Sequence, residues 1–373
     1  MRAKPIGIIR NKNKKEPLFI TYLFIIWAIL LVVAVLVTLS TPTKTKNRYY
    51  EEQIEAANLA KIAMEEIKNK KIEMGITFPK EDKYNSGMLG EWFSDITTTS
   101  GMIGAKRTAI NPDFAAVYID MFKDVGLKKG DEIALVMSGS FPTLNISAMA
   151  AVQVYGLKAC IMSSIGASTY GANDVNFTFF DMAEHLYNKG IFTNRIDYVS
   201  FGGANDDGYE FPEDVRESIL QRIKNSGIEF LCESDFEKNI EDRTKKILKE
   251  CPNIKLLISV GGTLIAMGEG DTGSSLYRGL VTPSYLNTNK EVKNGKLGLM
   301  DTFLDRDVPI VQMLNIKGIA LDYGIAYDPV VIPEIGTSDA YYEVKYSIAV
   351  PIISIIITIG LLVFYFVYRK NRI

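Results

Sequence analysis

The sequence predicts an α/β protein with a mainly parallel sheet, covered by helices on both faces and anchored by one transmembrane helix at each end. Short apolar runs alternate with helical segments from residue 111 to about 314, as is typical of parallel sheets. Two stretches of 22 residues, 18–39 and 347–368, contain no Asp, Glu, Lys, Arg or His. About 20 apolar residues suffice for a helix to cross a bilayer, so each stretch predicts a membrane span.

Basic residues flank both predicted spans. Residues 1–17 carry six Lys or Arg against one Glu, and residues 369–373 carry three basic residues and no acid. Because positive flanks stay in the cytoplasm, both tails are expected there, with the central part outside the cell (inner or plasma) membrane. The three basic residues Lys44, Lys46 and Arg48 follow the first span and oppose this orientation, but they are fewer than the six basic residues that precede it. A cleaved signal peptide is the alternative for the first span, although its apolar run exceeds a secretory core.

The segment 40–110 is expected to hold a juxtamembrane helix and a loop-rich stretch before the main domain. Residues 48–71 have apolar residues at helical spacing and no Gly or Pro, so they predict a helix that lifts the domain off the bilayer. Gly, Ser and Thr are frequent from 75 to 111, which favours loops. Asn111-Pro-Asp then begins a helix that ends near Gly126.

The extracytoplasmic domain is expected over residues 111–345. A strand at 132–138, a helix at 143–155 closed by Gly156, and a strand at 158–164 form a βαβ unit. The alternation continues, with 262–308 as a less regular lobe or flap. The further helices are predicted at 177–189, 212–225 and 235–250, and the further strands at 196–201, 228–231, 254–260 and 309–314.

Several classes of site are excluded or disfavoured by composition. His185 is the single histidine, so an imidazole zinc site is excluded, and a Ser-His-Asp triad would need that residue. The glycine turn after the first predicted strand, Ser-Gly-Ser-Phe-Pro at 138–142, is not the GxGxxG of a Rossmann fingerprint, and GxxxxGK[ST] does not occur. No cofactor, nucleotide or nucleic-acid partner is therefore expected. The three cysteines, Cys160, Cys232 and Cys251, are interpreted as small apolar residues. A calcium site at 205–207 is possible by composition, but a solvated turn is favoured and no metal is predicted.

Four predicted strands run into small residues, and this pattern predicts a shared cleft. In an open parallel sheet the ligand lies beyond the carboxyl ends of the strands, where glycine lets backbone amides approach. Helix N-termini behind such turns favour a carboxylate or phosphate. The alternative to a ligand site is a purely structural role, because the turns between strands and helices need small residues in any protein. The expected ligand-binding residues are Ser138, Gly139, Ser140, Ser163, Ser164, Asn205, Gly261, Gly262 and Thr263.

The sequence leaves open whether this cleft is catalytic. Ser140 follows a strand and precedes a helix, as a nucleophile elbow does, but the GxSxG frame is missing. Ser140 and Ser163 are therefore weak nucleophile candidates. A bulky residue in place of Gly139 or Gly262 is expected to block the ligand while leaving the strands intact.

Three stretches, together with the two-anchor plan, resemble the bacterial poly-γ-glutamate system protein family. They are Ser-Gly-Ser-Phe-Pro-Thr-Leu-Asn at 138–145, Ser-Ser-Ile-Gly-Ala-Ser-Thr-Tyr-Gly-Ala-Asn at 163–173, and Ser-Val-Gly-Gly-Thr at 259–263. The resemblance implies an accessory role in the synthesis and export of poly-γ-glutamate, an anionic capsule or secreted polymer. It also implies two partners, the ligase subunit of the synthase and its small membrane partner. The family offers no catalytic assignment for these positions.

The charge of the central part limits how it can meet such a polymer. The whole chain is at −2 and the two tails together at +8, so the centre is at about −10. A surface of this sign is poorly suited to grip a long polyanion, whereas a local pocket for one chain end or a glutamate is compatible with it. Without an ATP-binding loop, ligation is expected in another subunit. The alternative function is a membrane-anchored hydrolase or amidase that trims an external polymer, with Ser140 or Ser163 as nucleophile.

Overall fold

The computed structural model describes residues 18–269, 277–284 and 295–371. It divides the chain into two compact units, residues 1–46 with 343–373, and residues 47–342. The predicted basic tail at 1–17 lies outside the described residues. The boundary expected at 110 does not separate two units, because residues 47–110 belong to the same unit as the sheet.

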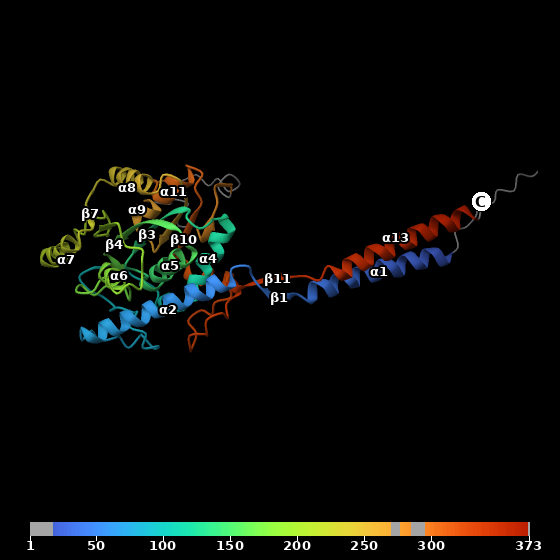
Figure 1. The fold of residues 1–373 in the computed structure, drawn as a ribbon, viewed down its shortest axis with the longest axis horizontal. Helices are drawn as coiled ribbons and strands as arrows, with labels where there is room; N and C mark the ends of the chain where they lie inside the picture. The colour runs from blue at the N-terminus through green and yellow to red at the C-terminus, as the bar shows by residue number, and fades with distance from the viewer. Residues whose placement is uncertain (1–17, 270–276, 285–294, 372–373) are drawn as a thin grey trace, which may run out of the picture. The chain divides into compact units, whose positions relative to one another are not determined.

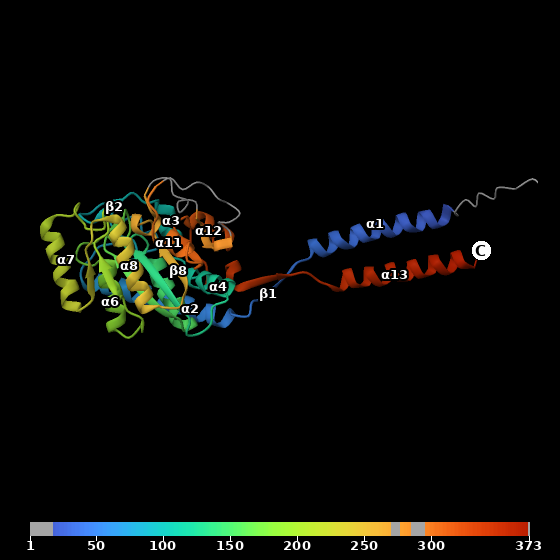
Figure 2. The same cartoon turned by 90° about the horizontal axis from the view of Figure 1, so that it is seen from above.

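The first unit pairs the two apolar helices, α1 (Leu18–Ser40) and α13 (Ala349–Lys370), which lie alongside each other in Figures 1 and 2. Trp27 Nε1 donates to Thr358 Oγ1 at 3.2 Å. Strand β1 (Thr43–Lys46) pairs with β11 (Tyr342–Lys345) beside the helices. Within the described residues, one helix, Ala349–Tyr368, has the length and hydropathy of a membrane span, and Phe24–Ser40 forms a shorter apolar helix.

The second unit is built on a seven-stranded sheet in the order β7-β6-β4-β3-β8-β10-β9. All neighbours are parallel except β9, which pairs antiparallel with β10 at one edge. The predicted α/β class and mainly parallel sheet are therefore confirmed. The strands are β3 (Glu132–Ser138), β4 (Lys158–Ser164), β6 (Tyr198–Ser200), β7 (Glu229–Leu231), β8 (Ile254–Val260), β9 (Gly279–Val281) and β10 (Ile310–Met313).

Helices cover both faces of this sheet (Figure 1). Successive residues of a strand point to opposite faces, so Ile133 and Leu135 enter one apolar core while Ala134 and Val136 enter the other. The first core is packed by α2 (Tyr50–Glu73), α4 (Phe114–Val125), α5 (Pro142–Tyr155), α6 (Phe179–Asn188), α7 (Glu213–Ser226) and α12 (Ile316–Asp322). The second is packed by α8 (Phe236–Glu250), α9 (Leu264–Met267) and α11 (Leu299–Leu304).

Helix α2 does not have the role that the sequence predicted. It was expected as a juxtamembrane spacer, but Ala56, Ala60, Ala63 and Ile67 are fully buried in the core. The helix packs against α4 and α5. Each alanine is only weakly hydrophobic, but a helix face made of alanines lets a neighbouring helix approach closely. Tertiary packing therefore buries α2 more than its amino-acid composition suggests.

The loop-rich stretch before residue 111 contains two short elements that place the site. Strand β2 (Thr97–Thr99) pairs in parallel with β5 (Ala167–Ser168), and α3 (Ile103–Thr108) follows directly. The helix predicted from Asn111 begins at Phe114 and ends at Gly126, which is left-handed with φ of 80°. Asp113 does not cap this helix with its side chain; instead it accepts from the amides of Gly336 and Ser338.

The sheet reverses its direction of winding between β3 and β8. From β3 the chain adds β4, β6 and β7 on one side, and it then returns to place β8 and β10 on the other. Neighbouring connections leave this point on opposite faces of the sheet, which opens a crevice beyond the carboxyl ends of β3 and β8. The fold therefore provides a natural binding position just after Ser138 and Val260.

Candidate functional site

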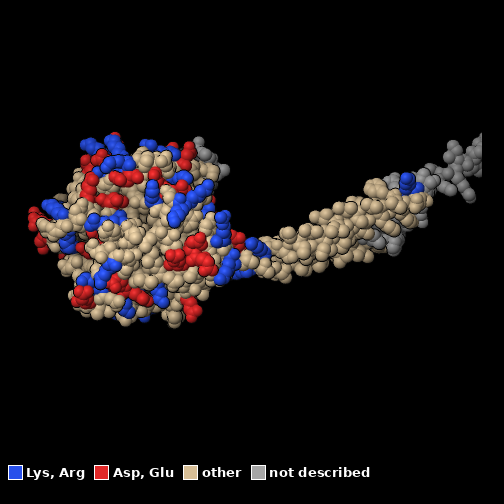
Figure 3. Space-filling view, viewed as in Figure 1, with Lys and Arg blue, Asp and Glu red and all other residues tan. Residues whose placement is uncertain are grey.

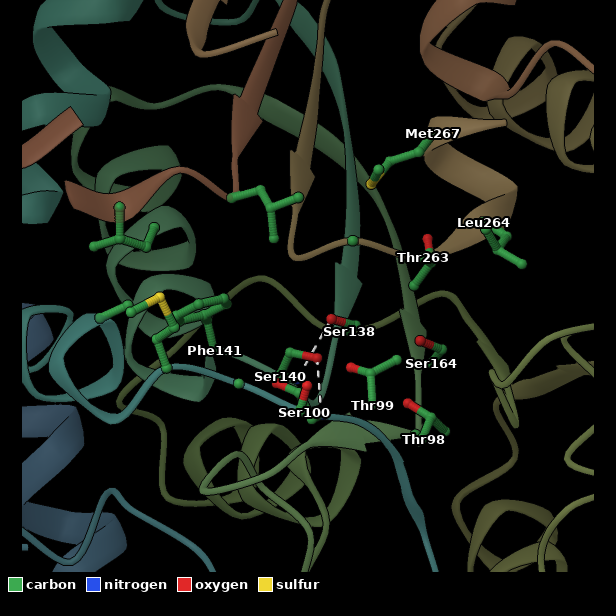
Figure 4. Close-up of a pocket in the computed structure, with 18 of the residues that line it drawn as sticks. Thr98, Thr99, Ser100, Ser138, Ser140, Phe141, Ser164, Thr263, Leu264 and Met267 are labelled. Atoms are coloured by element: carbon green, nitrogen blue, oxygen red, sulfur yellow. Dashed lines mark hydrogen bonds between the residues drawn. The ribbon is translucent and has the colours of Figure 1, made fainter. Parts of the chain in front are cut away.

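A pocket of about 770 Å³ lies at this switch point. Figure 4 shows hydroxyl side chains from different segments grouped around it, with Leu264 and Met267 to one side. Residues after β3, β4, β6 and β8 all reach its wall. The hydroxyl-bearing residues of the wall are Thr98, Thr99, Ser100, Ser138, Ser140, Ser164, Ser168, Thr263 and Tyr327.

Five of the nine residues expected at a ligand site line the pocket, namely Ser138, Ser140, Ser164, Gly262 and Thr263. Four do not. Ser163 is 1% exposed, and its neighbour in the strand takes the position at the wall. Asn205 is exposed at the surface, whereas Gly203 and Ala204 of the same loop reach the pocket. The other two are glycines, Gly139 and Gly261.

Gly139 and Gly261 serve the turns rather than the ligand wall. A Cβ at Gly139 would lie 2.7 Å from the carbonyl oxygen of Ile165, so this glycine allows the turn after β3 to touch the loop after β4. Gly261 has φ of 93°, a left-handed conformation that favours glycine. The expectation that a bulky residue at Gly139 would spare the fold is therefore wrong, because the added atoms would meet backbone.

The polar loop at 205–207 was expected to be a solvated turn, and at Asp206 this is wrong. Asp206 is 3% exposed, and its carboxylate pairs with the guanidinium of Arg243. It also accepts from Ser200 Oγ at 2.7 Å and Asn239 Nδ2 at 3.1 Å. A buried charge needs partners of this kind, so the loop is fastened to β6 and α8. Both carboxylate oxygens of Asp206 are thus used by donors of the protein itself, Oδ1 by Ser200 and Oδ2 by Asn239 and Arg243.

The serines of the pocket differ in how far their hydroxyls are already used. Ser138 Oγ accepts from the Ser140 amide at 3.3 Å, and Ser140 Oγ accepts from the Ser168 amide at 3.1 Å. Ser164 is 5% exposed, and its Oγ has no protein partner among the described residues. A buried hydroxyl without a partner is costly, so Ser164 offers a ligand an unused hydrogen bond.

Lys106 of α3 lies directly behind the serines, and no sequence pattern predicted it at the site. Its side chain is 2% exposed. Nζ lies 2.7 Å from Ser168 Oγ, donates to the Ser140 carbonyl, and sits 4.1 Å from the centre of the Phe141 ring. Burial lowers the pKa of Lys106 to about 7. At neutral pH this amine is therefore partly deprotonated, and such shifted pKa values are common at functional sites.

The pairing of β2 with β5 holds Ser168 beside this lysine. The Thr169 amide donates to the Thr99 carbonyl at 2.9 Å, and the Gly101 amide donates to Thr169 Oγ1 at 2.7 Å. A Cβ at Gly101 would lie 2.9 Å from Lys106 Cε and 3.0 Å from Ser168 Oγ. Glycine at 101 therefore leaves room for the lysine and the serine to meet.

Two charged side chains, Glu210 and Lys317, contribute to the wall itself. Glu210 accepts from the Ala204 amide at 3.0 Å, which holds its loop in place. Lys317 is exposed, with Nζ 5.7 Å from the Tyr327 ring. The pocket thus combines hydroxyl donors, one exposed cation and the N-terminal end of α5, which begins at Pro142 next to the lining residue Phe141.

His185 lies outside this pocket. Its Nε2 is 2.8 Å from Glu66 Oε1, and this hydrogen bond lowers the pKa of the Glu66 carboxyl. Helix α6 is thereby joined to α2. The packing interpretation of the sequence fits this contact, and the pocket has no imidazole among the residues that line it.

Fold and site together define a doubly wound α/β protein with a polar, hydroxyl-rich pocket at the switch point of its sheet. No family model and no curated protein matches the chain. Weakly similar solved structures include a multiple substrate aminotransferase from Thermococcus profundus, at 15% identity and TM-score 0.14, and a kynurenine aminotransferase from Pyrococcus horikoshii, at 12% identity and TM-score 0.12. The matches cover 46% and 54% of this chain, and 40% and 41% of those chains. The chain thus spans less than half the length of either one, and likeness at this level carries no functional argument.

Proposed function

We propose that this chain is a membrane-anchored accessory protein of poly-γ-glutamate synthesis and export whose α/β unit binds a carboxylate of the polymer or of glutamate. The observation that carries the binding proposal is the convergence of Ser138, Ser140, Ser164 and Thr263 on one pocket. The pathway rests on the resemblance of the three serine- and glycine-rich stretches. In this proposal the ligase subunit and a small membrane protein are the partners.

The chemistry of the pocket suits a carboxylate. Ser164 supplies a buried hydroxyl without a protein partner, and Lys317 supplies a positive charge at an exposed position. The N-terminal end of α5 adds a favourable dipole. Figure 3 shows Lys, Arg, Asp and Glu intermixed over one face of the unit, so a single ligand group would be held by local donors rather than by a broad positive field.

Two membrane spans with both termini in the cytoplasm are part of the same proposal. Trp27 pairs with Thr358 near the middle of the two apolar segments, and the Phe24 ring, earlier in the first segment, pairs with the Tyr365 ring, later in the second, so the two helices run antiparallel. Antiparallel helices of this kind place both chain ends on one side. Figure 3 shows the helix pair free of charged residues along most of its length.

Binding can be tested with the full chain in detergent and short γ-linked glutamate oligomers. Titration calorimetry is expected to give saturable binding that Ser164→Ala and Lys317→Met weaken about tenfold each, since a charge-assisted hydrogen bond contributes about 1.5–3 kcal/mol. Glu210→Gln is the matched variant, and it is expected to strengthen binding by removing a like charge from the wall. Unchanged affinity in all three variants would place the ligand elsewhere.

A second candidate is the membrane-anchored hydrolase. Ser163 is outside the pocket, so of the two expected nucleophiles only Ser140 reaches the wall. The observation that favours a hydrolase is the contact between the Ser168 hydroxyl and the Lys106 amine, whose pKa is about 7, at the pocket.

A further inference from the structure

We infer that Ser168 and Lys106 form a nucleophile and base pair that cleaves a γ-linked amide bond of a glutamyl chain bound in the pocket. The inference rests on the proposed ligand class and adds a covalent step to it. Neither residue stood among those that the sequence singled out for catalysis. The pair is defined by the 2.7 Å separation of Lys106 Nζ and Ser168 Oγ.

The position of the two groups fits a division of roles. Ser168 lines the pocket, whereas Lys106 is buried behind it and is not part of the wall. Lys106 Nζ donates to the Ser140 carbonyl, which fixes the amine, and it also contacts Ser168 Oγ. When the amine is neutral, its lone pair can accept the Ser168 hydroxyl proton. Among the described serines that line the pocket, Ser168 is the one whose hydroxyl is hydrogen-bonded to this amine.

Lys106 is buried without an acidic partner among the described residues. Desolvation alone accounts for its lowered pKa, with no acidic side chain of the described residues offsetting it. An amine removed from water without an acid partner destabilises a fold, and a methionine would fill similar space without that penalty. A neutral amine beside a hydroxyl is the arrangement that activates serine in Ser-Lys enzymes.

The step balances without a cofactor. Ser168 Oγ attacks the γ-carbonyl carbon and its proton passes to Lys106 Nζ; the C–N bond then breaks, and the leaving amine takes that proton. Water attacks the resulting ester, gives a proton to Nζ and releases a carboxylic acid, while the proton returns to Ser168 Oγ. The Ser140 hydroxyl, whose oxygen accepts from the Ser168 amide at 3.1 Å, is placed to donate to the oxyanion.

The test uses the full chain in detergent and a fluorescent fluorophosphonate, which modifies activated serines. The expected result is a single adduct on Ser168 that Ser168→Ala abolishes. Lys106→Met and Lys106→Arg are both expected to slow labelling by about 10²–10⁴-fold, because arginine keeps the charge but cannot act as a base. The wild-type rate is expected to rise with pH around pH 7, as the amine loses its proton.

Two serine variants serve as controls. Ser163→Ala removes a buried hydroxyl next to the site, and Ser218→Ala removes an exposed one on α7. Both are expected to label at the wild-type rate. Labelling that persists in Ser168→Ala, moves to Ser140 or Ser163, or is absent from folded wild-type protein overturns the inference.

Cleavage and binding can fail separately. Ser168→Ala is expected to bind short γ-linked glutamate oligomers but not to shorten them, whereas wild type shortens them. Binding without cleavage in the wild type would leave the accessory function standing and remove the enzyme. Labelling of Ser168 without any binding of oligomers would keep the activated serine but overturn the ligand class.

Discussion

At the scale of single residues, Lys106 controls a pH dependence of stability. Its pKa of about 7 in the folded protein lies below the value near 10.4 of an unfolded lysine. Between these values the unfolded chain holds more protons, so the free energy of unfolding rises with pH across this window. Below pH 7 the lysine is charged in both states, and its burial penalty is at its largest.

Lys106→Met removes this titration. The variant is expected to exceed wild type in unfolding free energy by on the order of 2–4 kcal/mol at pH 6, and the difference should shrink toward pH 10. Urea titrations of the detergent-solubilised chain measure it. Lys71, whose pKa burial lowers to about 8, titrates in both proteins and therefore cancels in the difference. A gap that stays constant with pH would contradict the assigned pKa.

Asp206 gives a second prediction at this scale. Removal of one partner of a buried ion pair leaves an uncompensated charge, so Asp206→Ala is expected to cost about 3–5 kcal/mol of stability. Asn205→Ala, one residue away and exposed, is the matched control and is expected to stay within about 0.5 kcal/mol. Thermal unfolding of both variants measures the contrast, and equal melting temperatures would mean that the Arg243 contact is dispensable.

The sequence predicted the site residues that follow apolar strands and missed those that lie in short elements. Ser138, Ser140, Ser164 and Thr263 follow apolar strands, and strand ends meet at one edge of a parallel sheet, so their convergence followed from sequence. Lys106 and Ser168 sit in short elements without a periodic signal. Their meeting depends on the parallel pairing of β2 with β5 across some 70 residues, and no local pattern encodes such a register.

At the scale of elements, the turn after β3 carries a prediction about two glycines. Gly139→Val is expected to lower the melting temperature strongly, because its side chain would meet the Ile165 carbonyl. Gly262→Ala meets only the side chains of Leu314 and Met267 at 3.3–3.4 Å, and these can move. It is therefore expected to melt near wild type while it narrows the pocket. Differential scanning calorimetry measures both melting temperatures. A wild-type melting temperature for Gly139→Val would show that the turn after β3 does not require glycine at this position.

The regular elements were largely predictable, and the irregular ones were not. Strands β3, β4 and β8 are continuous apolar runs, which only burial on both faces explains. The region 262–308, expected as a lobe or flap, instead supplies α9, the edge strand β9 and α11. These pieces have three to six residues each, too short for a hydrophobic period to be recognised.

At the scale of the whole molecule, the native cysteines can test the proposed orientation across the membrane. Cys160 and Cys251 are buried and Cys232 is exposed, all without disulfides. A membrane-impermeant maleimide is expected to label intact cells through Cys232, and Cys232→Ser should remove the signal. Burial raises the pKa of the Cys232 thiol, so labelling proceeds better at pH 8 than at pH 7. Labelling only after lysis would place the α/β unit in the cytoplasm.

The two ends of the α/β unit are joined to each other by hydrogen bonds. The Asn47 amide donates to the Tyr341 carbonyl at 3.0 Å, and Asn47 Nδ2 donates to the Ala340 carbonyl at 2.7 Å. A unit whose two ends lie side by side can be expressed without the flanking helices, or its ends can be joined by a short linker. New termini can then be introduced at a surface turn, as in circular permutation, with the strand order of the sheet unchanged. In the full chain, the same closeness lets the fold sit as an insertion between α1 and α13, so the apolar helix pair and the pocket architecture can be changed independently by genetic recombination.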